Sequence, residues 1–472
     1  MRIDLKGDVK MNFKRIISLI LSAVFLISLC SVNVFAAKKG VALNKTSASV
    51  TVGKSITLKP TVTGVKDYTL QWSTSDKTKA TVSKSGKVTG VKAGTVTITV
   101  KIKNTNYKAS CKVTVKKATN KSTASTTTAT QNKNSSSGDA MDFVKNIKIG
   151  WNLGNTLDSV GDWINDDLAF ETAWGNPKTT EAMIKAVKKA GFNAVRIPTS
   201  WGDHLDSNNK ISKEWMDRVQ TVVDYAYKND MYVILNIHHE NDWFIPSKDS
   251  KEMSSRFTSI WKQISERFKN YDEHLIFEGL NEPRTENSAN GWNGGTAAER
   301  KVVNKYNQLF VDIVRKSGGN NKLRYLMVPT YAANCWSPAI DDLVVPDDDR
   351  VIVSIHAYLP YSLALDTNSS VSKFTDDDKK TIDSVLKGLN DKFIKKGIPV
   401  IIGEFGWTNK NNDSERAKLA KYYVSAAKKI GIPCFWWDNG ADDKGETFLL
   451  LNRKTLKFDH EEVLKALMEG IK

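Results

Sequence analysis

Hydrophobic and polar residues alternate in short runs between about residues 41 and 117, for example over residues 49–52 and 95–100. Successive side chains of a β-strand point to opposite faces of its sheet, so a period of two predicts strands with one buried and one exposed face. Glycines and Asp-Lys pairs interrupt the runs at the positions expected for turns. The pattern predicts a small all-β sandwich over residues 37–117.

A different pattern begins at residue 139 and continues to residue 472, where nearly continuous apolar runs alternate with segments of helical periodicity. Such apolar runs are typical of parallel strands buried on both faces, and the amphipathic segments between them are typical of crossover helices. We expect strands near residues 147–154, 194–198, 232–237, 275–280, 326–330, 351–356, 400–404 and 434–438. We expect helices near residues 180–190, 213–229, 254–268, 299–316, 376–396 and 414–430. This alternation predicts an α/β fold, a (β/α)8 TIM barrel over residues 139–472.

Two further segments flank the predicted sandwich. Residues 1–36 contain Lys14 and Arg15, then an apolar run too short to span a bilayer, and end in the small residue Ala36, which is the pattern of a secretory signal peptide. Residues 118–138 include 11 serines and threonines and no aromatic residue, which predicts a flexible linker. We therefore expect a secreted protein, extracellular or associated with the cell wall, without a membrane span.

The net charge of +17 is carried entirely by the first part of the chain. Residues 37–138 hold 19 lysines and two aspartates, whereas residues 139–472 hold 45 basic and 48 acidic residues. The lysines are spread along the strands rather than clustered with stacking aromatics, which argues against nucleic acid as a partner. Two interpretations of this charge remain open: a spacer kept soluble by its lysines, or a weak electrostatic contact with an anionic cell-envelope polymer.

Cys111, Cys335 and Cys434 are too few for a disulfide framework and lack the spacing of a metal site. We expect buried thiols, no bound metal and no cofactor.

Polar residues follow most of the predicted barrel strands. The carboxyl ends of all strands of a TIM barrel meet at one mouth, which carries the active site. The second predicted strand ends in Arg196, the third in His238-His239-Glu240 and the fourth in Asn281-Glu282-Pro283. The sixth ends in His356-Ala357-Tyr358, the seventh in Glu404 and the eighth in Trp436-Trp437-Asp438.

Glu282 and Glu404 are the two carboxylates expected on opposite walls of this mouth. Hydrolysis of a glycosidic bond needs one carboxyl group to protonate the leaving oxygen and a second to act at the anomeric carbon. A barrel of this size can hold them about 5–5.5 Å apart, which implies retention of configuration. Either glutamate alone could be a solvated loop residue; the pair in its two sequence contexts indicates a glycosidase.

The barrel region resembles glycoside hydrolase family 5. The resemblance rests on GWNLGNTLD at residues 150–158, ETAWGNP at 171–177, VRIPTSW at 195–201 and NIHHE at 236–240, together with the contexts of Glu282 and Glu404. The first two motifs point toward bacterial endoglucanases that also accept xyloglucan or mixed-linkage glucan. Residues 37–117 resemble the bacterial immunoglobulin-like domains of group 2, which are spacer and adhesion modules.

The family resemblance implies a role for each strand-end residue. Glu282 would be the general acid/base and Glu404 the nucleophile. Arg196 and Tyr358 would contact the nucleophile, Asn281 would bind the sugar 2-hydroxyl, and His238 and His356 would orient the substrate and tune the acid. The residues expected to bind the sugar are Asn155, His239, Trp174, Trp243 and Trp437.

Strand alternation leads us to expect that only one histidine of the 238–239 pair faces the mouth, with His238 favoured. Trp201, Trp336 and Trp407 are further candidates for sugar stacking, although several tryptophans must belong to the core. A strand-end arginine such as Arg196 could also be only a structural ion pair.

We expect a monomeric endo-β-1,4-glucanase that acts on cellulose-type or mixed-linkage glucans. A xyloglucanase or β-mannanase on the same barrel is an alternative, because loops rather than the two glutamates select the sugar. A non-catalytic glycan-binding adhesin is an alternative of another class. An adhesin would have no need of both Glu282 and Glu404 with Arg196, His356 and Tyr358 around them.

Overall fold

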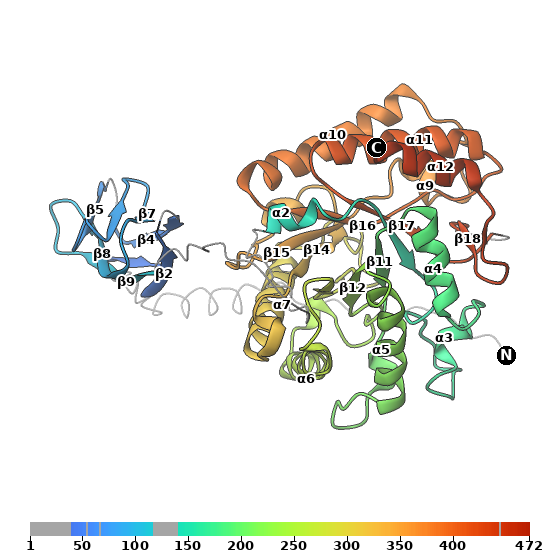
Figure 1. The fold of residues 1–472 in the computed structure, drawn as a ribbon, viewed down its shortest axis with the longest axis horizontal. Helices are drawn as coiled ribbons and strands as arrows, with labels where there is room; N and C mark the ends of the chain where they lie inside the picture. The colour runs from blue at the N-terminus through green and yellow to red at the C-terminus, as the bar shows by residue number, and fades with distance from the viewer. Residues whose placement is uncertain (1–38, 53–54, 66–67, 117–139, 443–444) are drawn as a thin grey trace, which may run out of the picture. The chain divides into compact units, whose positions relative to one another are not determined.

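The structure is a computed structural model that describes residues 39–52, 55–65, 68–116, 140–442 and 445–472 (Figure 1). The expected signal peptide at residues 1–36 and the expected linker at 118–138 lie outside the described residues. The chain forms two compact units, which are described separately.

The N-terminal unit is built only from strands within its described residues. A four-stranded sheet has the order β2-β9-β8-β5, a three-stranded sheet the order β3-β7-β6, and β1 pairs with β4. Residues from both larger sheets, including Val88, Ile98 and Val113, form its core, and Trp72 packs against them. The all-β fold is thereby confirmed, and Trp72 belongs to the core. The strands are β1 (Gly40–Leu43), β2 (Ser47–Thr51), β3 (Ser55–Thr57), β4 (Pro60–Thr63), β5 (Leu70–Thr74), β6 (Ala80–Val82), β7 (Lys87–Gly90), β8 (Gly94–Ile102) and β9 (Lys108–Lys116).

The C-terminal unit is a closed barrel of parallel strands in sequence order from β10 to β17. Its helices surround the strands (Figure 1), which confirms the TIM-barrel prediction. The barrel strands are β10 (Gly150–Leu153), β11 (Ala194–Ile197), β12 (Tyr232–Asn236), β13 (Leu275–Glu278), β14 (Leu326–Asn334), β15 (Val351–His356), β16 (Val400–Phe405) and β17 (Cys434–Asp438). The longer outer helices are α4 (Glu181–Ala190), α5 (Lys213–Tyr227), α6 (Lys251–Phe268), α7 (Ala297–Lys316), α10 (Asp376–Lys392), α11 (Asp413–Lys429) and α12 (Glu461–Gly470).

Local sequence signals define the ends of these helices. Thr296 accepts a hydrogen bond from the backbone N–H of Glu299, whose side chain accepts from the backbone N–H of Thr296, so a capping box starts α7. Helix α4 is terminated by the following residue, Gly191, whose φ of 113° only glycine adopts without strain. The amphipathic faces of these helices pack against the apolar outer face of the strands.

The amino-terminal end of the barrel is closed by apolar side chains. The short helix α2 (Ala140–Val144) packs Phe143 against Tyr325, beneath a layer of strand residues that includes Ile234, Met327 and Phe435. A Cβ on Gly150 would lie 2.0 Å from the Phe435 ring, so glycine is required where this ring fills the interior. The interior is therefore packed at this end, and polar chemistry is confined to the other.

The first and last strands of the barrel are joined by the buried side chain of Asn152. Its Nδ2 donates to the backbone carbonyls of Gly403 at 2.9 Å, Trp436 at 3.2 Å and Phe435 at 3.3 Å. These contacts add side-chain bonds to the backbone pairing of β10 with β17. One buried amide thus ties β10 to β16 and β17, which lie more than 250 residues later in the sequence.

Strand β14 extends further than the sequence predicted, to Asn334 rather than Thr330. The carboxyl-terminal part of this strand is irregular, since Ala332 and Ala333 have positive φ and the register of pairing with β15 shifts between Pro329 and Asn334. Within the described residues, Cys111, Cys335 and Cys434 are buried free thiols, as predicted. Among the described residues, no helix is both long and apolar enough to cross a membrane.

Candidate active site

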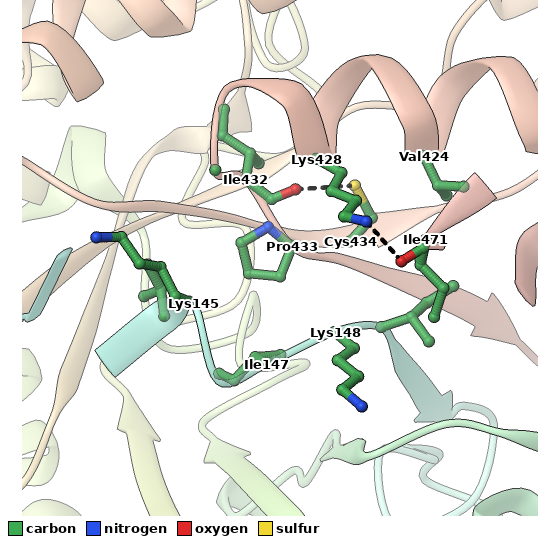
Figure 2. A pocket seen from close by; sticks show the side chains of 12 residues that line it. Lys145, Ile147, Lys148, Val424, Lys428, Ile432, Pro433, Cys434 and Ile471 are labelled. Carbon is green, nitrogen blue, oxygen red and sulfur yellow. Dashed lines mark hydrogen bonds between the residues drawn. The ribbon is translucent and has the colours of Figure 1, made fainter. Parts of the chain in front are cut away.

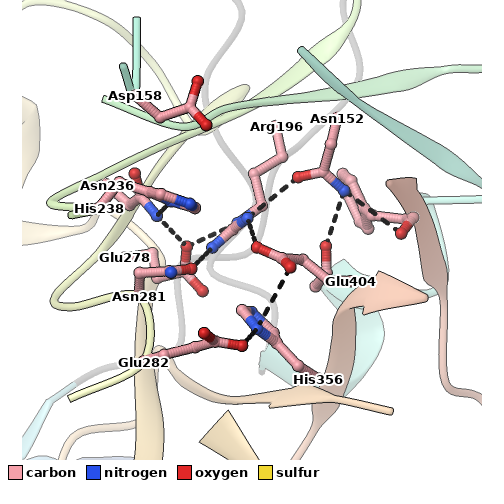
Figure 3. Close-up of polar contacts among 12 residues, drawn as sticks. Asn152, Asp158, Arg196, Asn236, His238, Glu278, Asn281, Glu282, His356 and Glu404 are labelled. Atoms are coloured by element: carbon pink, nitrogen blue, oxygen red, sulfur yellow. Dashed lines mark hydrogen bonds and ion pairs between the residues drawn. The ribbon is translucent and has the colours of Figure 1, made fainter. Parts of the chain in front are cut away.

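A fully buried arginine organises the carboxyl end of the barrel (Figure 3). Arg196, on β11, donates from Nε to Glu278 and from Nη1 to Glu404, each at 2.7 Å. Its Nη2 donates to Asn281 Oδ1 at 2.7 Å, and Nη1 also donates to Asn152 Oδ1 at 3.0 Å. Burial alone would lower the pKa of Arg196, but the two carboxylates raise it, so the guanidinium stays charged.

Glu404, on β16, has a donor for each carboxyl oxygen. Arg196 donates to Oε1, and the Tyr358 hydroxyl donates to Oε2 at 2.8 Å. Burial raises the pKa of Glu404, and the nearby carboxyl of Glu282 adds to this rise, while the positive charges of His356 and Arg196 oppose it. The two donors fix the carboxylate in one orientation, as a nucleophile requires.

Glu282, in the loop after β13, lies beside Glu404 and shares a histidine with it. His356 Nδ1 lies 2.8 Å from Glu282 Oε1 and 3.5 Å from Glu404 Oε2. One oxygen of each carboxyl and one ring nitrogen of His356 all lie within 4.8 Å of one another. The expected carboxylate pair is therefore brought together at one point of the barrel mouth.

The charges in this group set the position of a proton. Burial raises the pKa of Glu282, but the hydrogen bond from His356 and the positive charges of His356 and Arg284 outweigh it, so the net shift is downward. Burial lowers the pKa of His356, but Glu404 and Glu282 outweigh it, so the net shift is upward. Both shifts favour the charged forms, a carboxylate on Glu282 and an imidazolium on His356, and the two groups titrate as one coupled pair.

Glu278 belongs to this network but was not among the predicted site residues. It is the last residue of β13, is fully buried, and accepts from Arg196, from Ser354 Oγ at 2.5 Å and from Asn236 Nδ2 at 3.0 Å. Asn236 also contacts His238 Nδ1 at 3.1 Å. A single charged residue within an apolar strand was the available signal, because a buried carboxylate requires partners.

The rings of His238 and His239 lie side by side, with centroids 4.5 Å apart, whereas we expected the two side chains to point in opposite directions. That expectation rested on strand alternation, but β12 ends at Asn236, before either histidine. The His238 ring is nearly parallel to the Trp437 indole, with centroids 5.8 Å apart, and His239 lies 5.6 Å from Trp174. Burial lowers the pKa of His239 to about 4 and that of His238 well below its ordinary value, so both rings are neutral near pH 7.

The remaining predicted sugar-binding residues lie in loops after the strands. Asn155 follows β10, has a positive φ and donates its backbone N–H to Asp158. The indole of Trp243 is half-buried and donates to Glu240, a carboxylate that also accepts from the backbone of Trp201. Burial raises the pKa of Glu240 to about 8.

The other tryptophan candidates divide between core and surface. Trp201 and Trp407 are fully buried and belong to the core, whereas Trp336 is exposed. A buried indole cannot stack on a polysaccharide, so of these three only Trp336 remains available for sugar.

A cavity of about 260 Å³ lies at the opposite end of the barrel (Figure 2). Ile147 and Lys148 line it just before β10, and Pro433 and Cys434 line it at the start of β17. Lysine and aliphatic side chains dominate its wall, and neither predicted catalytic carboxylate is among its lining residues. The chemically equipped site is therefore the mouth at the carboxyl ends of the strands.

Two family models match the chain. The model for cellulase of glycosyl hydrolase family 5 matches residues 157–443, and the model for the group 2 bacterial Ig-like domain matches residues 37–113. The first covers most of the barrel, and the second covers the all-β unit.

Among curated proteins, endoglucanase A of Clostridium longisporum is 52% identical over 342 residues, 71% of this chain. The match spans 66% of that relative, slightly less than two thirds of its length. A solved broad-specificity endoglucanase of subfamily GH5-4 from Ruminococcus champanellensis, with bound cellotriose, is 50% identical with a TM-score of 0.69. The match covers 71% of this chain and 99% of the Ruminococcus champanellensis chain. A third similar structure is XEG5A, a xyloglucan-specific endo-β-1,4-glucanase from a metagenomic library, solved in complex with cellotriose. It is 41% identical with a TM-score of 0.67, and the match covers 70% of this chain and 98% of XEG5A.

Proposed function

Because the chain belongs to glycoside hydrolase family 5, we propose that it is a retaining endo-β-1,4-glucanase with Glu282 as general acid/base and Glu404 as nucleophile. The observation that carries this proposal is the approach of the two carboxyls, since one oxygen of Glu282 and one oxygen of Glu404 lie within 4.8 Å of each other. Retaining enzymes hold their carboxyls about 5–5.5 Å apart, whereas inverting enzymes need about 6.5–9.5 Å to admit a water molecule between carboxylate and sugar.

In the first step, a Glu404 oxygen attacks the anomeric carbon of the sugar and the bond from this carbon to the leaving oxygen breaks. Glu282 transfers its proton to that oxygen, so the shortened glucan leaves as a neutral alcohol. A covalent glycosyl ester on Glu404 remains. The chain thus supplies both the nucleophile and the proton.

In the second step, water attacks the same carbon from the side that the leaving glucan has vacated. Glu282, now a carboxylate, takes a proton from this water, and the bond between Glu404 and the sugar breaks. Two inversions at one carbon give net retention, and both side chains return to their starting states.

His356 supplies the route by which Glu282 becomes an acid. The two groups are 2.8 Å apart and share one exchangeable proton. Moving this proton from the imidazolium to the carboxylate gives an imidazole and a carboxylic acid without any change in the total protonation of the site. Substrate that displaces water around Glu282 favours this move, because desolvation penalises the carboxylate.

Arg196 and Asn281 prepare the site for the charges of the transition state. Arg196 favours the ionised form of Glu404 and fixes its position before substrate arrives. It also holds the Asn281 carbonyl oxygen at 2.7 Å, which leaves the Asn281 amide N–H groups available for the sugar 2-hydroxyl. A hydrogen bond to that hydroxyl strengthens as positive charge develops on the sugar ring.

The substrate class that the site favours is a β-linked glucan chain. The relatives support this, since two solved neighbours carry bound cellotriose. Xyloglucan is a second candidate, because XEG5A is a xyloglucan-specific member with the same barrel. We further propose that the protein is exported and acts outside the cell, as the signal-like pattern of residues 1–36 indicates.

The direct test is to follow a cellotetraose or lichenan digest by proton NMR and to measure the reducing ends released from cellulose derivatives, lichenan, xyloglucan, mannan and xylan. We expect fresh β-anomer as the first product and the highest rate on a β-1,4-containing glucan. Fresh α-anomer would overturn the retaining assignment. Activity confined to mannan or xylan would overturn the glucanase assignment, and binding without any hydrolysis would indicate an adhesin.

A further inference from the structure

Trp292 is a large aromatic side chain left exposed in the loop that carries the proposed acid. It follows β13, as Glu282 does, and 58% of its surface is accessible. It is nevertheless held in place: the Arg284 guanidinium lies 4.0 Å from its ring centre, and its backbone carbonyl accepts from Asn334 Nδ2 at 2.9 Å. An indole fixed in this way presents a rigid apolar surface to solvent, which is the property of a platform for a sugar ring.

Arg284 connects this indole to the proposed acid. Its Nη1 lies 3.9 Å from Glu282 Oε2, and its Nη2 donates to Glu286 at 2.8 Å. Glu286 also accepts from Asn241 Nδ2, in the loop after β12, at 2.7 Å. The guanidinium is thus fixed by an acidic partner on one side and an aromatic ring on the other, and its charge is directed at Glu282.

The two oxygens of Glu282 face different surroundings. Oε1 faces His356, which in turn approaches Glu404, whereas Oε2 faces Arg284. The acid delivers its proton to the leaving oxygen, so the Glu282 side away from Glu404 borders the departing part of the glucan. Arg284 and Trp292 therefore lie toward the leaving-group sugars.

We propose that Trp292 stacks on a sugar of the leaving-group side and holds Arg284 in place, so that Trp292 is a specificity-determining residue and Arg284 a positioning residue for the acid Glu282. The proposal rests on the proposed function of the two glutamates. A cation near Glu282 favours its carboxylate, so loss of Arg284 would make this acid retain its proton to higher pH. Trp292 influences the same group indirectly, because the indole fixes the guanidinium by a cation–π contact.

The experiment compares Trp292→Ala, Arg284→Gln and Arg284→Lys in the full chain. The profile of kcat/KM against pH is measured on unsubstituted cello-oligosaccharides of increasing length. We expect Arg284→Gln to move the basic limb to higher pH and Arg284→Lys to restore it in part. Trp292→Ala should lower kcat/KM about 10-fold on oligosaccharides long enough to reach the leaving-group side, mainly through KM, and should move the basic limb in the same direction by less.

Trp163→Ala is the matched control, since Trp163 is a similarly exposed tryptophan in the loop after β10 and makes no contact with Arg284 within the part of the chain that the structure describes. Its basic limb should stay at the wild-type position. The proposal is overturned if Trp292→Ala leaves both the length dependence and the basic limb unchanged, or if Arg284→Gln leaves the limb unchanged while circular dichroism shows a folded protein. An unimpaired Glu404→Gln variant would instead refute the proposed function itself.

Discussion

Arg196 and Glu404 form an ion pair with a nitrogen-to-oxygen distance of 2.7 Å and almost no solvent access. The same guanidinium is paired with Glu278 at 2.7 Å, so one cation balances two buried carboxylates. A buried charge without a partner is strongly unfavourable, and each member of this group depends on the others. Stability and chemistry are therefore linked at one residue.

Removal of Arg196 should affect both properties. Arg196→Met leaves Glu278 and Glu404 without their cation, and we expect a loss of about 3–5 kcal/mol in the free energy of unfolding, measured by urea denaturation. The pKa of Glu404 should rise, because a positive charge that favours its ionised form is gone. The acidic limb of kcat/KM against pH should consequently move to higher pH.

Arg218→Met is the control for this experiment. Arg218 forms a similarly buried ion pair with Glu171, at 2.6 Å, and also donates to the Thr179 carbonyl rather than to the catalytic pair. It should destabilise the protein without moving the acidic limb. If the acidic limb of kcat/KM lay at the same pH in Arg196→Met and Arg218→Met, Arg196 would have only a structural role.

Glu404→Gln should reduce turnover on the order of 10⁴-fold, because the amide cannot form the glycosyl ester. Azide should restore part of the rate, since a small anion can enter the space of the missing nucleophile, and the product should be the inverted α-glycosyl azide. Product configuration is read by NMR. Rescue with retention would assign the nucleophile to another residue.

Glu282→Ala should distinguish substrates by their leaving groups. A dinitrophenyl cellobioside needs no proton on its leaving oxygen, so the first step should remain fast, whereas cellotetraose hydrolysis should fall by about 10²–10⁴-fold. Stopped-flow release of the phenolate measures the first step separately from the second. Equal losses on both substrates would argue against Glu282 as the acid.

A truncated chain that begins at Asp139 should keep the full rate on soluble lichenan. It retains helix α2, whose Phe143 and Val144 close the amino-terminal end of the barrel. It lacks the expected signal peptide, the all-β unit and the expected linker. A further truncation that removes α2 should lower the melting temperature, because it exposes this apolar layer. Inactivity of the first truncation, with α2 intact, would show that the all-β unit supports the barrel.

The lysine-rich unit should bind purified anionic cell-wall polymer weakly. Comparison of the full chain with the Asp139 truncation in cosedimentation assays should show binding only for the full chain. This binding should weaken between low and physiological salt, where charges are screened over about 8 Å. Binding that salt does not weaken would exclude an electrostatic contact, and absence of binding at low salt would leave the lysines as solubilising groups of a spacer.

The strand pattern was sufficient to predict the barrel and the residues that end its strands, because the parallel strands are mostly apolar and their carboxyl ends meet at the same mouth. Glu278 could not be assigned in the same way, because it ends β13 in the structure but lay inside the predicted strand of residues 275–280, and its partners meet it only when the barrel closes. Arg284 and Trp292 were missed because loop conformation depends on contacts such as that of Asn334 with Trp292, which no periodic pattern encodes. The departure of His238 and His239 from strand alternation has a similar origin, since alternation ceases where the strand ends.

The three hydrogen bonds of Asn152 have a consequence for biosynthesis. This residue precedes its partners Gly403, Phe435 and Trp436 by more than half of the chain, and it also contacts Arg196. A growing polypeptide cannot complete these bonds until its last barrel strand has left the ribosome. The protein should therefore be inactive toward polysaccharide throughout its synthesis. Hydrolysis should begin only after β10 has paired with β17 and the barrel is closed.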